Sequence, residues 1–192
     1  MYIAAAPESA AAAAVRESTV ASQGFSMNLT QAWAWRPDVY DGFAALRTQL
    51  SAASSLGKRE LAVMVCAGAS ELGDAYCSLA WGRTLAREGG ARLAVAVLTG
   101  ERAADATPRE QALAAWARRV VADPNATTAA DVQALRDAGL GEREIFEATV
   151  FIALRQAFST VNAALGIAPD ARLAEEAPAL VLAAVDYGRQ PG

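Results

Sequence analysis

Apolar residues recur along this chain with the spacing of α-helices. Tyr40, Phe43 and Leu46, for example, lie three positions apart and therefore on one helix face. Glycine, proline and N-cap residues mark where such stretches begin and end. The pattern predicts helices over residues 7–22, 37–50, 58–72, 75–88, 91–98, 107–121, 127–138, 141–165 and 175–185. We therefore expect an all-α protein of about eight to ten helices.

Residues 91–98 form the one run that also fits a β-strand, but the chain offers no partner strands, so a short helix is preferred. No linker or low-complexity segment divides the sequence. We expect a single domain over residues 1–192, with N-terminal helices over 7–54, a central core over 57–98 and C-terminal helices over 107–185. The tail over 187–192 is expected to be loose.

Composition and charge narrow the function classes. Hydrophobic residues make up 54% of the chain, and its net charge of −4 gives no basic stripe for nucleic acid. No segment approaches the ~20 uncharged apolar residues of a membrane span. The first residues up to Pro7 lack a basic region, which makes them a poor secretory signal. These features predict a cytoplasmic protein without nucleic-acid or membrane partners.

Histidine is absent from the sequence, and only two cysteines are present, Cys66 and Cys77. This removes the usual proton shuttle and the commonest metal ligand. No Ser-His-Asp or Cys-His couple can be built from this chain alone, and we expect neither a metal nor a cofactor.

Cys77 is the residue with the clearest chemical potential. With Asp74 as N-cap it occupies the third position of a helix, where unpaired amides and the helix dipole favour a thiolate. The carboxylate of Asp74 opposes ionisation, and Trp81 one turn further would desolvate the sulfur. The alternative is a cysteine packed beside a core tryptophan. Cys66 is interpreted as a small buried hydrophobe.

Glu60 and Glu71 are candidate catalytic acids. They lie eleven positions apart, nearly on one helix face, and their alignment toward the helix that bears Cys77 suggests a buried acid. The alternative is an exposed helix face, where carboxylates usually lie.

The sequence around these residues resembles the alkylhydroperoxidase D and carboxymuconolactone decarboxylase superfamily, whose motif is Arg-Glu-Leu, a glycine turn and Cys-x-Tyr-Cys-x-x-x-His. Arg59-Glu60-Leu61 is similar to the first element and Tyr76-Cys77 to the second. Further similar stretches lie at 24–29, 36–37, 138–140 and 158–166. The resemblance implies an AhpD-like helical bundle that assembles as a dimer, trimer or hexamer.

The chain departs from that motif at two chemically important positions. The first cysteine of the family falls at Asp74 and its histidine at Trp81. The family's glutamate lies twelve positions before the first cysteine, whereas Glu60 lies fourteen before Asp74. Cys77 matches the cysteine that attacks peroxide, so resolving its sulfenic acid would need Cys66, another subunit or an external thiol.

Three functions follow from these observations. The resemblance implies a peroxidase-like antioxidant oxidoreductase with peroxiredoxin-type, one-cysteine chemistry at Cys77, in a pocket lined by Tyr76 and Trp81. The lost motif residues favour instead a non-catalytic protein for ligand binding or assembly. A carboxymuconolactone decarboxylase-like acid-base enzyme that uses Glu60, Glu71 and Asp74 is the third interpretation. Core packing is the expected role of three other tryptophans, Trp33, Trp35 and Trp116.

Overall fold

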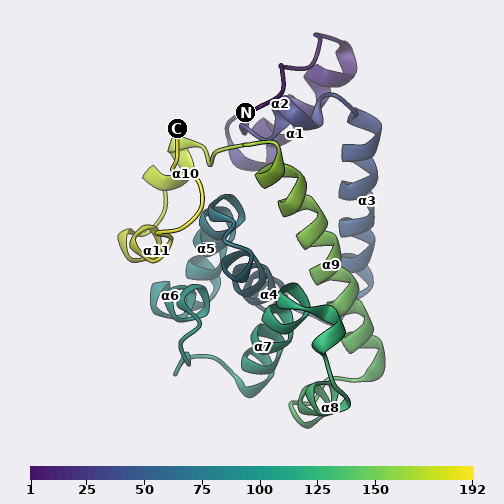
Figure 1. The fold of residues 1–192 in the computed structure, drawn as a ribbon, viewed down its shortest axis with the longest axis vertical. Coiled ribbons are helices and arrows are strands. Elements are labelled where there is room, and N and C mark those ends of the chain that lie inside the picture. Colours follow the sequence, from purple (N-terminus) through teal and green to yellow (C-terminus); the bar gives the residue numbers. More distant parts are fainter.

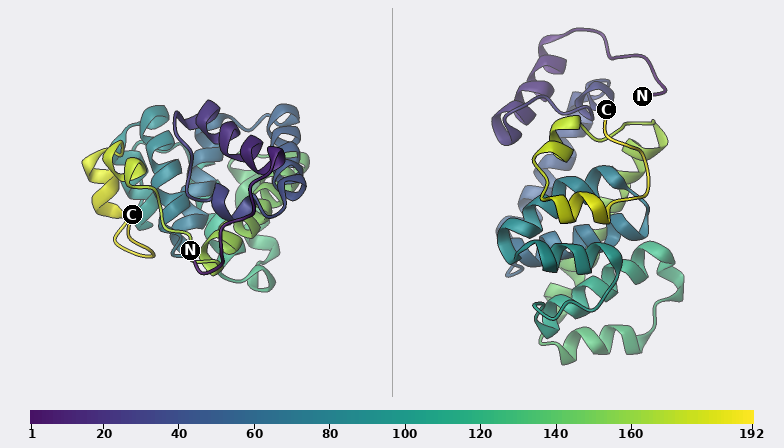
Figure 2. Two further views of the ribbon diagram at one scale, coloured as in Figure 1. Left: turned by 90° about the horizontal axis from the view of Figure 1, so that it is seen from above. Right: turned by 90° about the vertical axis from the view of Figure 1, so that its left-hand side faces the viewer.

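The computed structural model describes all 192 residues and contains helices but no strands (Figure 1). Its elements are α1 Ala10–Gln23, α2 Thr30–Trp33, α3 Pro37–Ala53, α4 Lys58–Glu71, α5 Ala75–Gly89, α6 Ala91–Thr99, α7 Pro108–Ala122, a 3₁₀ turn Pro124–Ala126, α8 Ala129–Asp137, α9 Glu142–Ala164, α10 Ala171–Glu175 and α11 Ala179–Ala184. The all-α prediction is confirmed, and residues 91–98 are helical as expected. Both termini lie at the end of the molecule opposite α8 (Figures 1 and 2).

The C-terminal region differs from the prediction. A single helix was expected over 175–185, but the structure has two short helices, α10 and α11, separated at Pro178. The proline ring disfavours helical backbone at the preceding residue, which ends the first helix and lets a second begin. The tail is also held in place, because Gly192 N donates to Pro169 O at 3.0 Å and Tyr187 Oη donates to Ser78 Oγ at 2.9 Å.

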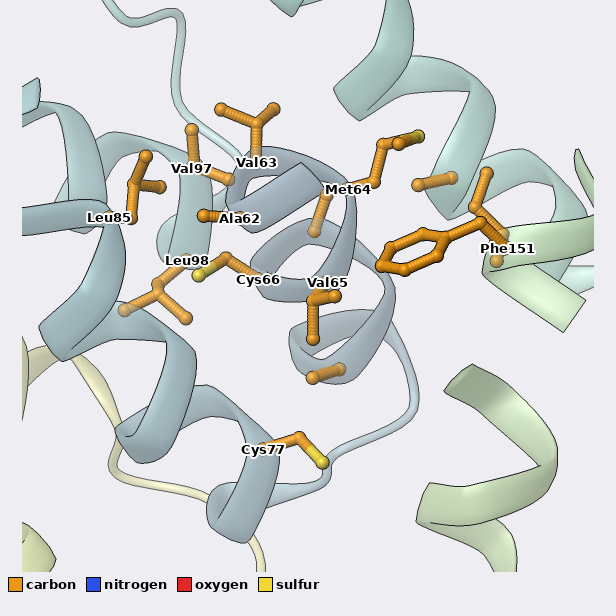
Figure 3. Close-up of a cluster of buried hydrophobic side chains, with 14 of the residues drawn as sticks. Ala62, Val63, Met64, Val65, Cys66, Cys77, Leu85, Val97, Leu98 and Phe151 are labelled. Atoms are coloured by element: carbon orange, nitrogen blue, oxygen red, sulfur yellow. The ribbon is translucent and has the colours of Figure 1, made fainter. Parts of the chain in front are cut away.

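Helix α4 lies at the centre of the bundle. Every residue from Ala62 to Ala69 is buried, because α5, α6, α7 and α9 all pack against it. Side chains leave α4 in several directions, toward Leu85 and Leu98 on one side and toward Phe151 on another (Figure 3). Alanine and glycine supply half of this buried stretch, which lets neighbouring helices approach closely.

The N-terminal helices attach mainly to α9. Trp33 of α2 is stacked on Phe158, with ring centroids 4.7 Å apart, and its indole nitrogen donates to Asn162 Oδ1 at 2.8 Å. The expected core role of Trp33 is thus confirmed, as is that of buried Trp116, whereas Trp35 is exposed. Helix α3 runs beside α9 and has no fully buried residue; Tyr40 and Phe43 pack against the core, and its inner side also borders a cavity. None of the helices combines the length and apolarity needed to cross a bilayer.

Close packing of α5 against α11 can be tested at Gly82. A Cβ atom there would lie 2.7 Å from Val181 Cγ1 and 3.3 Å from Leu98 Cδ1, whereas one at Gly42, inside α3, would meet nothing within 4 Å. We expect Gly82→Ala to lower the free energy of unfolding by about 1–2 kcal/mol, because overpacking outweighs the gain in helix propensity. Gly42→Ala, the matched control, should raise it by up to about 1 kcal/mol. Urea unfolding followed by circular dichroism measures both, and a Gly82→Ala variant as stable as the parent would contradict the packing.

Candidate functional site

Cys77 is the third residue of α5 and lies directly above its N-cap. The backbone amide of Cys77 donates to Asp74 Oδ1 at 3.2 Å, which is the capping geometry expected from the sequence. Gly73, with a φ of 70°, makes the left-handed turn that ends α4 and brings the chain into this cap. The thiol is therefore positioned by a turn and cap encoded within five residues.

Two donors from α9 reach the sulfur of Cys77. Arg155 Nη2 lies 3.4 Å and Ser159 Oγ 3.3 Å from Sγ, and the two residues are one helical turn apart. Only 3% of Cys77 is exposed. Burial, followed by the charge of Asp74, raises the pKa of the Cys77 thiol to about 12, against the opposing effects of Arg155 and Ser159. In the ligand-free protein the thiol is consequently protonated at neutral pH.

Arg155 is a buried cation without a carboxylate partner. It is 8% exposed, and its Nε atom has no hydrogen-bond partner. Its guanidinium carbon lies 5.2 Å from the ring centroid of Trp81 and 5.3 Å from that of Phe158, so two aromatic faces hold it. Arg155 of α9 therefore supplies the positive charge beside the thiol, and its guanidinium packs on the ring of Trp81 of α5.

Cys77, Trp81 and Arg155 line an open pocket of about 720 Å³. The volume lies within the range of small-molecule sites. Helices α1, α3, α4, α5 and α9 contribute to its wall, and Arg47 of α3 belongs to it. Its apolar wall comprises Met27, Leu29, Leu56, Leu61, Phe151 and Phe158 together with alanines and aromatic rings.

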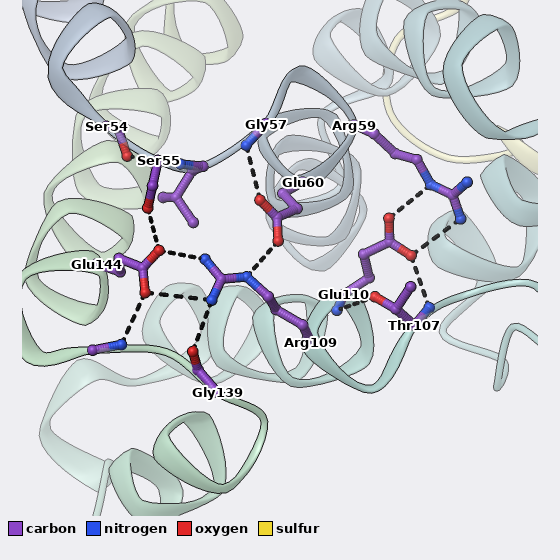
Figure 4. A network of polar contacts seen from close by, with 12 residues as sticks. Ser54, Ser55, Gly57, Arg59, Glu60, Thr107, Arg109, Glu110, Gly139 and Glu144 are labelled. Atoms are coloured by element: carbon purple, nitrogen blue, oxygen red, sulfur yellow. Dashed lines mark hydrogen bonds and ion pairs between the residues drawn. The ribbon is translucent and has the colours of Figure 1, made fainter.

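Glu60 does not lie in this pocket. Its carboxylate accepts from Gly57 N at 2.8 Å at the start of α4 and from Arg109 Nε at 2.6 Å (Figure 4). Arg109 also binds Glu144 Oε1 at 2.6 Å, so this network joins α4, α7 and α9. The expected role of Glu60 beside the thiol is corrected, because the carboxylate is used to cap and connect helices.

Glu71 is also separate from the thiol. It pairs with Arg118 at 3.5 Å and lines a different cavity, with Trp116 and Asp131. Of the three predicted carboxylates, only Asp74 lies at Cys77, and it is buried with Oδ2 unpaired. An acid-base pair of Glu60 and Glu71 is thus not formed.

Tyr76 borders the pocket but is engaged elsewhere. Its hydroxyl donates to Asp170 Oδ2 and accepts from Leu29 N at 3.5 Å. Burial, followed by the hydrogen bond to Asp170, raises the pKa of the Tyr76 phenol. Tyr76 therefore fixes α5 to two distant segments and holds its proton.

Cys66 and Cys77 are both free thiols and face different surroundings. Cys66 on α4 points toward Leu98, whereas the sulfur of Cys77 on α5 points away from it (Figure 3). Cys66 has no exposed surface and does not line the pocket. Its interpretation as a small buried hydrophobe is confirmed. No cluster of three histidine, cysteine or acidic side chains is arranged to hold a metal ion.

Sequence reasoning missed Arg47, Arg155 and Ser159. The sequence did contain a signal for Arg155 and Ser159. The buried positions of α9 are apolar up to Ile152, and the buried positions after it are Arg155, Ser159 and Asn162. Polar residues that continue an apolar helical stripe mark a buried polar site. Arg47 has no such signal, because exposed arginines are common.

Solved structures share the fold of this chain over about nine-tenths of its length. A peroxidase-related protein from Ralstonia eutropha JMP134, described as an alkylhydroperoxidase AhpD core, superposes with a TM-score of 0.77 at 24% identity, over 89% of this chain and 94% of its own. The fold is that of the AhpD core. A peroxidase-related protein from Silicibacter sp. TM1040 has a TM-score of 0.79 at 21% identity, covering 90% and 91% of the two chains.

A third structure with the AhpD-like fold is a cysteine-to-alanine variant of the debrominase Bmp8 in complex with 2,3,4-tribromopyrrole. It has a TM-score of 0.75 at 18% identity, over 92% of this chain and 96% of its own. Neither a protein-family model nor a curated protein matches the sequence. The AhpD-like fold is therefore carried by structural similarity, with little sequence identity.

The opposing effects of Asp74 and Arg155 on the thiol can be measured in a Cys66→Ala background. Asp74→Asn removes a negative charge that raises the pKa of Cys77, so alkylation by iodoacetamide at pH 8 should accelerate. Arg155→Met removes the stabilising cation and should slow it. Asp123→Asn, at the start of the distant 3₁₀ turn, is the matched control and should leave the rate unchanged. Equal rates in all variants would show that neither charge acts on Cys77.

Proposed function

We propose that this protein is an alkylhydroperoxidase-like thiol enzyme that reduces organic hydroperoxides with a single cysteine, Cys77. The observation that carries the proposal is the position of Sγ, which accepts hydrogen bonds from Arg155 and Ser159 and lines a pocket of about 720 Å³. Both donors stabilise a thiolate, and the pocket is large enough for a small organic substrate. The AhpD-like fold supports the same chemistry.

In the proposed reaction, the sulfur of Cys77 attacks the outer oxygen of a hydroperoxide, ROOH. An S–O bond forms, the O–O bond breaks, and the alkoxide leaves. The thiol proton passes to the departing alkoxide as the S–O bond forms. The products are an alcohol, ROH, and the sulfenic acid of Cys77.

Reduction of the sulfenic acid requires two equivalents of an external thiol. The first forms a mixed disulfide with Cys77 and releases water, and the second releases the free Cys77 thiol and a disulfide of the reductant. Cys66 is not proposed as the resolving residue, because it is completely buried outside the pocket. The reaction thus differs from a cycle between two cysteines of one motif.

The raised pKa of Cys77 limits the rate of this reaction. With a pKa of about 12, only about one thiol in 10⁵ is ionised at pH 7. Transfer of the thiol proton to the departing alkoxide during the attack, rather than attack by a preformed thiolate, is therefore the proposed route. We expect turnover slower than that of an enzyme with a histidine relay.

Ligand binding without chemistry is the second candidate function. The protonated, 3%-exposed thiol favours it, and the complex of debrominase Bmp8 with 2,3,4-tribromopyrrole concerns a protein of the same fold. In this interpretation the pocket retains its ligand and Cys77 is part of its wall.

Chemical trapping distinguishes the two functions. Treatment with cumene hydroperoxide and dimedone should place a sulfenic-acid label on Cys77, identified by mass spectrometry. Peroxide consumption with an excess of a small thiol should be lost in Cys77→Ser and retained in Cys66→Ala, the matched control. Arg155→Met should slow consumption roughly tenfold or more, because a charge-assisted hydrogen bond to the sulfur is removed. An unlabelled Cys77, or full activity in Cys77→Ser, would leave ligand binding as the function.

A further inference from the structure

The pocket at Cys77 carries an excess of positive charge. Its lining includes Arg47, Lys58 and Arg155 but no aspartate or glutamate. Lys58 is neutralised by an ion pair with Glu88 at 2.8 Å. Arg47 and Arg155 form no ion pair, although most arginines of this chain do.

Arg47 and Arg155, which form no ion pair, line the same cavities. Both border the main pocket and a smaller cleft beside Phe43 and Phe158. Arg47 is exposed at the mouth, where partial desolvation, followed by the charge of Arg155, lowers its pKa. Arg155 is 8% exposed, with Nε unpaired. A buried cation with an unused donor is unfavourable unless an anion compensates it.

Most of the remaining lining is apolar, although Thr19, Ser22, Gln23, Thr48, Ser51 and Thr84 also border the pocket. Leu29, Leu56 and Leu61 line it together with the rings of Trp81 and Phe158. A ligand that fits these surroundings carries one negative group and an apolar body.

We infer that the pocket binds an organic carboxylate, with the carboxylate group at the guanidinium groups of Arg47 and Arg155 and the apolar body against Leu29, Leu56 and Leu61. Guanidinium groups bind carboxylates through paired, charge-assisted hydrogen bonds. The inference rests on the proposed function in that both use the same pocket, and under that function the substrate is a hydroperoxide that carries a carboxylate.

Isothermal titration calorimetry with decanoate and decanol tests the inference. The two probes share their apolar chain and differ in charge. Decanoate should bind at least roughly tenfold more tightly than decanol, and its affinity should fall as salt is added. Equal affinity for both probes, or binding of neither, would overturn the proposal.

Substitutions of Arg47 and Arg155 test whether these two residues bind the carboxylate. Arg47→Met should weaken decanoate binding roughly tenfold and leave decanol unaffected, and Arg155→Met should have at least the same effect. Arg143→Met, at an exposed position of α9, is the control and should bind like the parent. Because Arg47 lies at the exposed mouth, its replacement keeps the test valid if the Arg155 variant fails to fold. Unchanged decanoate affinity in Arg47→Met would contradict the inference.

These measurements use neither peroxide nor reductant. If decanoate binds but no sulfenic acid forms at Cys77, only the proposed peroxide reduction is contradicted. If Cys77 reduces peroxide but the pocket does not prefer decanoate over decanol, only the inferred carboxylate site is contradicted.

Discussion

Burial of the central stretch of α4, residues 62–69, is the constraint on which the rest of the structure depends. A helix enclosed over residues 62–69 needs small side chains where its neighbours approach, and it needs partners on several sides. The turn at Gly73 then places the start of α5 against α4, and α9 packs on another side. Cys77 and Arg155 meet because both of their helices pack on this common centre. The Glu60–Arg109–Glu144 network also joins α4 to α9, through α7.

The chemistry of the site follows from charges that act on one sulfur in opposite directions. Burial and the carboxylate of Asp74 favour the thiol, whereas Arg155 and Ser159 favour the thiolate. Burial is the largest of these effects, so the thiol is favoured over the thiolate at neutral pH. The positive charge of Arg155 is held between Trp81 and Phe158, but these rings leave its Nε donor unused. The same guanidinium donates through Nη2 to Cys77 Sγ and lines the pocket, so it links the thiol to the proposed carboxylate site.

Local features of the chain predicted the helices and the start of α5 well. The start of α5 is determined by residues adjacent in sequence: the glycine turn, Asp74 as N-cap and Cys77 as third residue. It could therefore be predicted from the sequence. The division of the last helix at Pro178 was also encoded locally and was overlooked. Arg155 lies 78 positions from Cys77, and no local signal states which helices will face one another. For Glu60, the sequence indicated which side of the helix the carboxylate lies on but not what it contacts. In the structure it binds Arg109 of α7.

The relative rates at which iodoacetate and iodoacetamide alkylate Cys77, measured in Cys66→Ala, report whether this thiol lies in a cationic pocket. Both reagents form a thioether with the same sulfur, but only iodoacetate is an anion. If Cys77 is a reactive thiol in a cationic pocket, the ratio of the iodoacetate rate to the iodoacetamide rate will exceed that of a small free thiol. The ratio will fall toward the free-thiol value in Arg47→Met. A ratio at or below the free-thiol value in the parent protein would contradict the account.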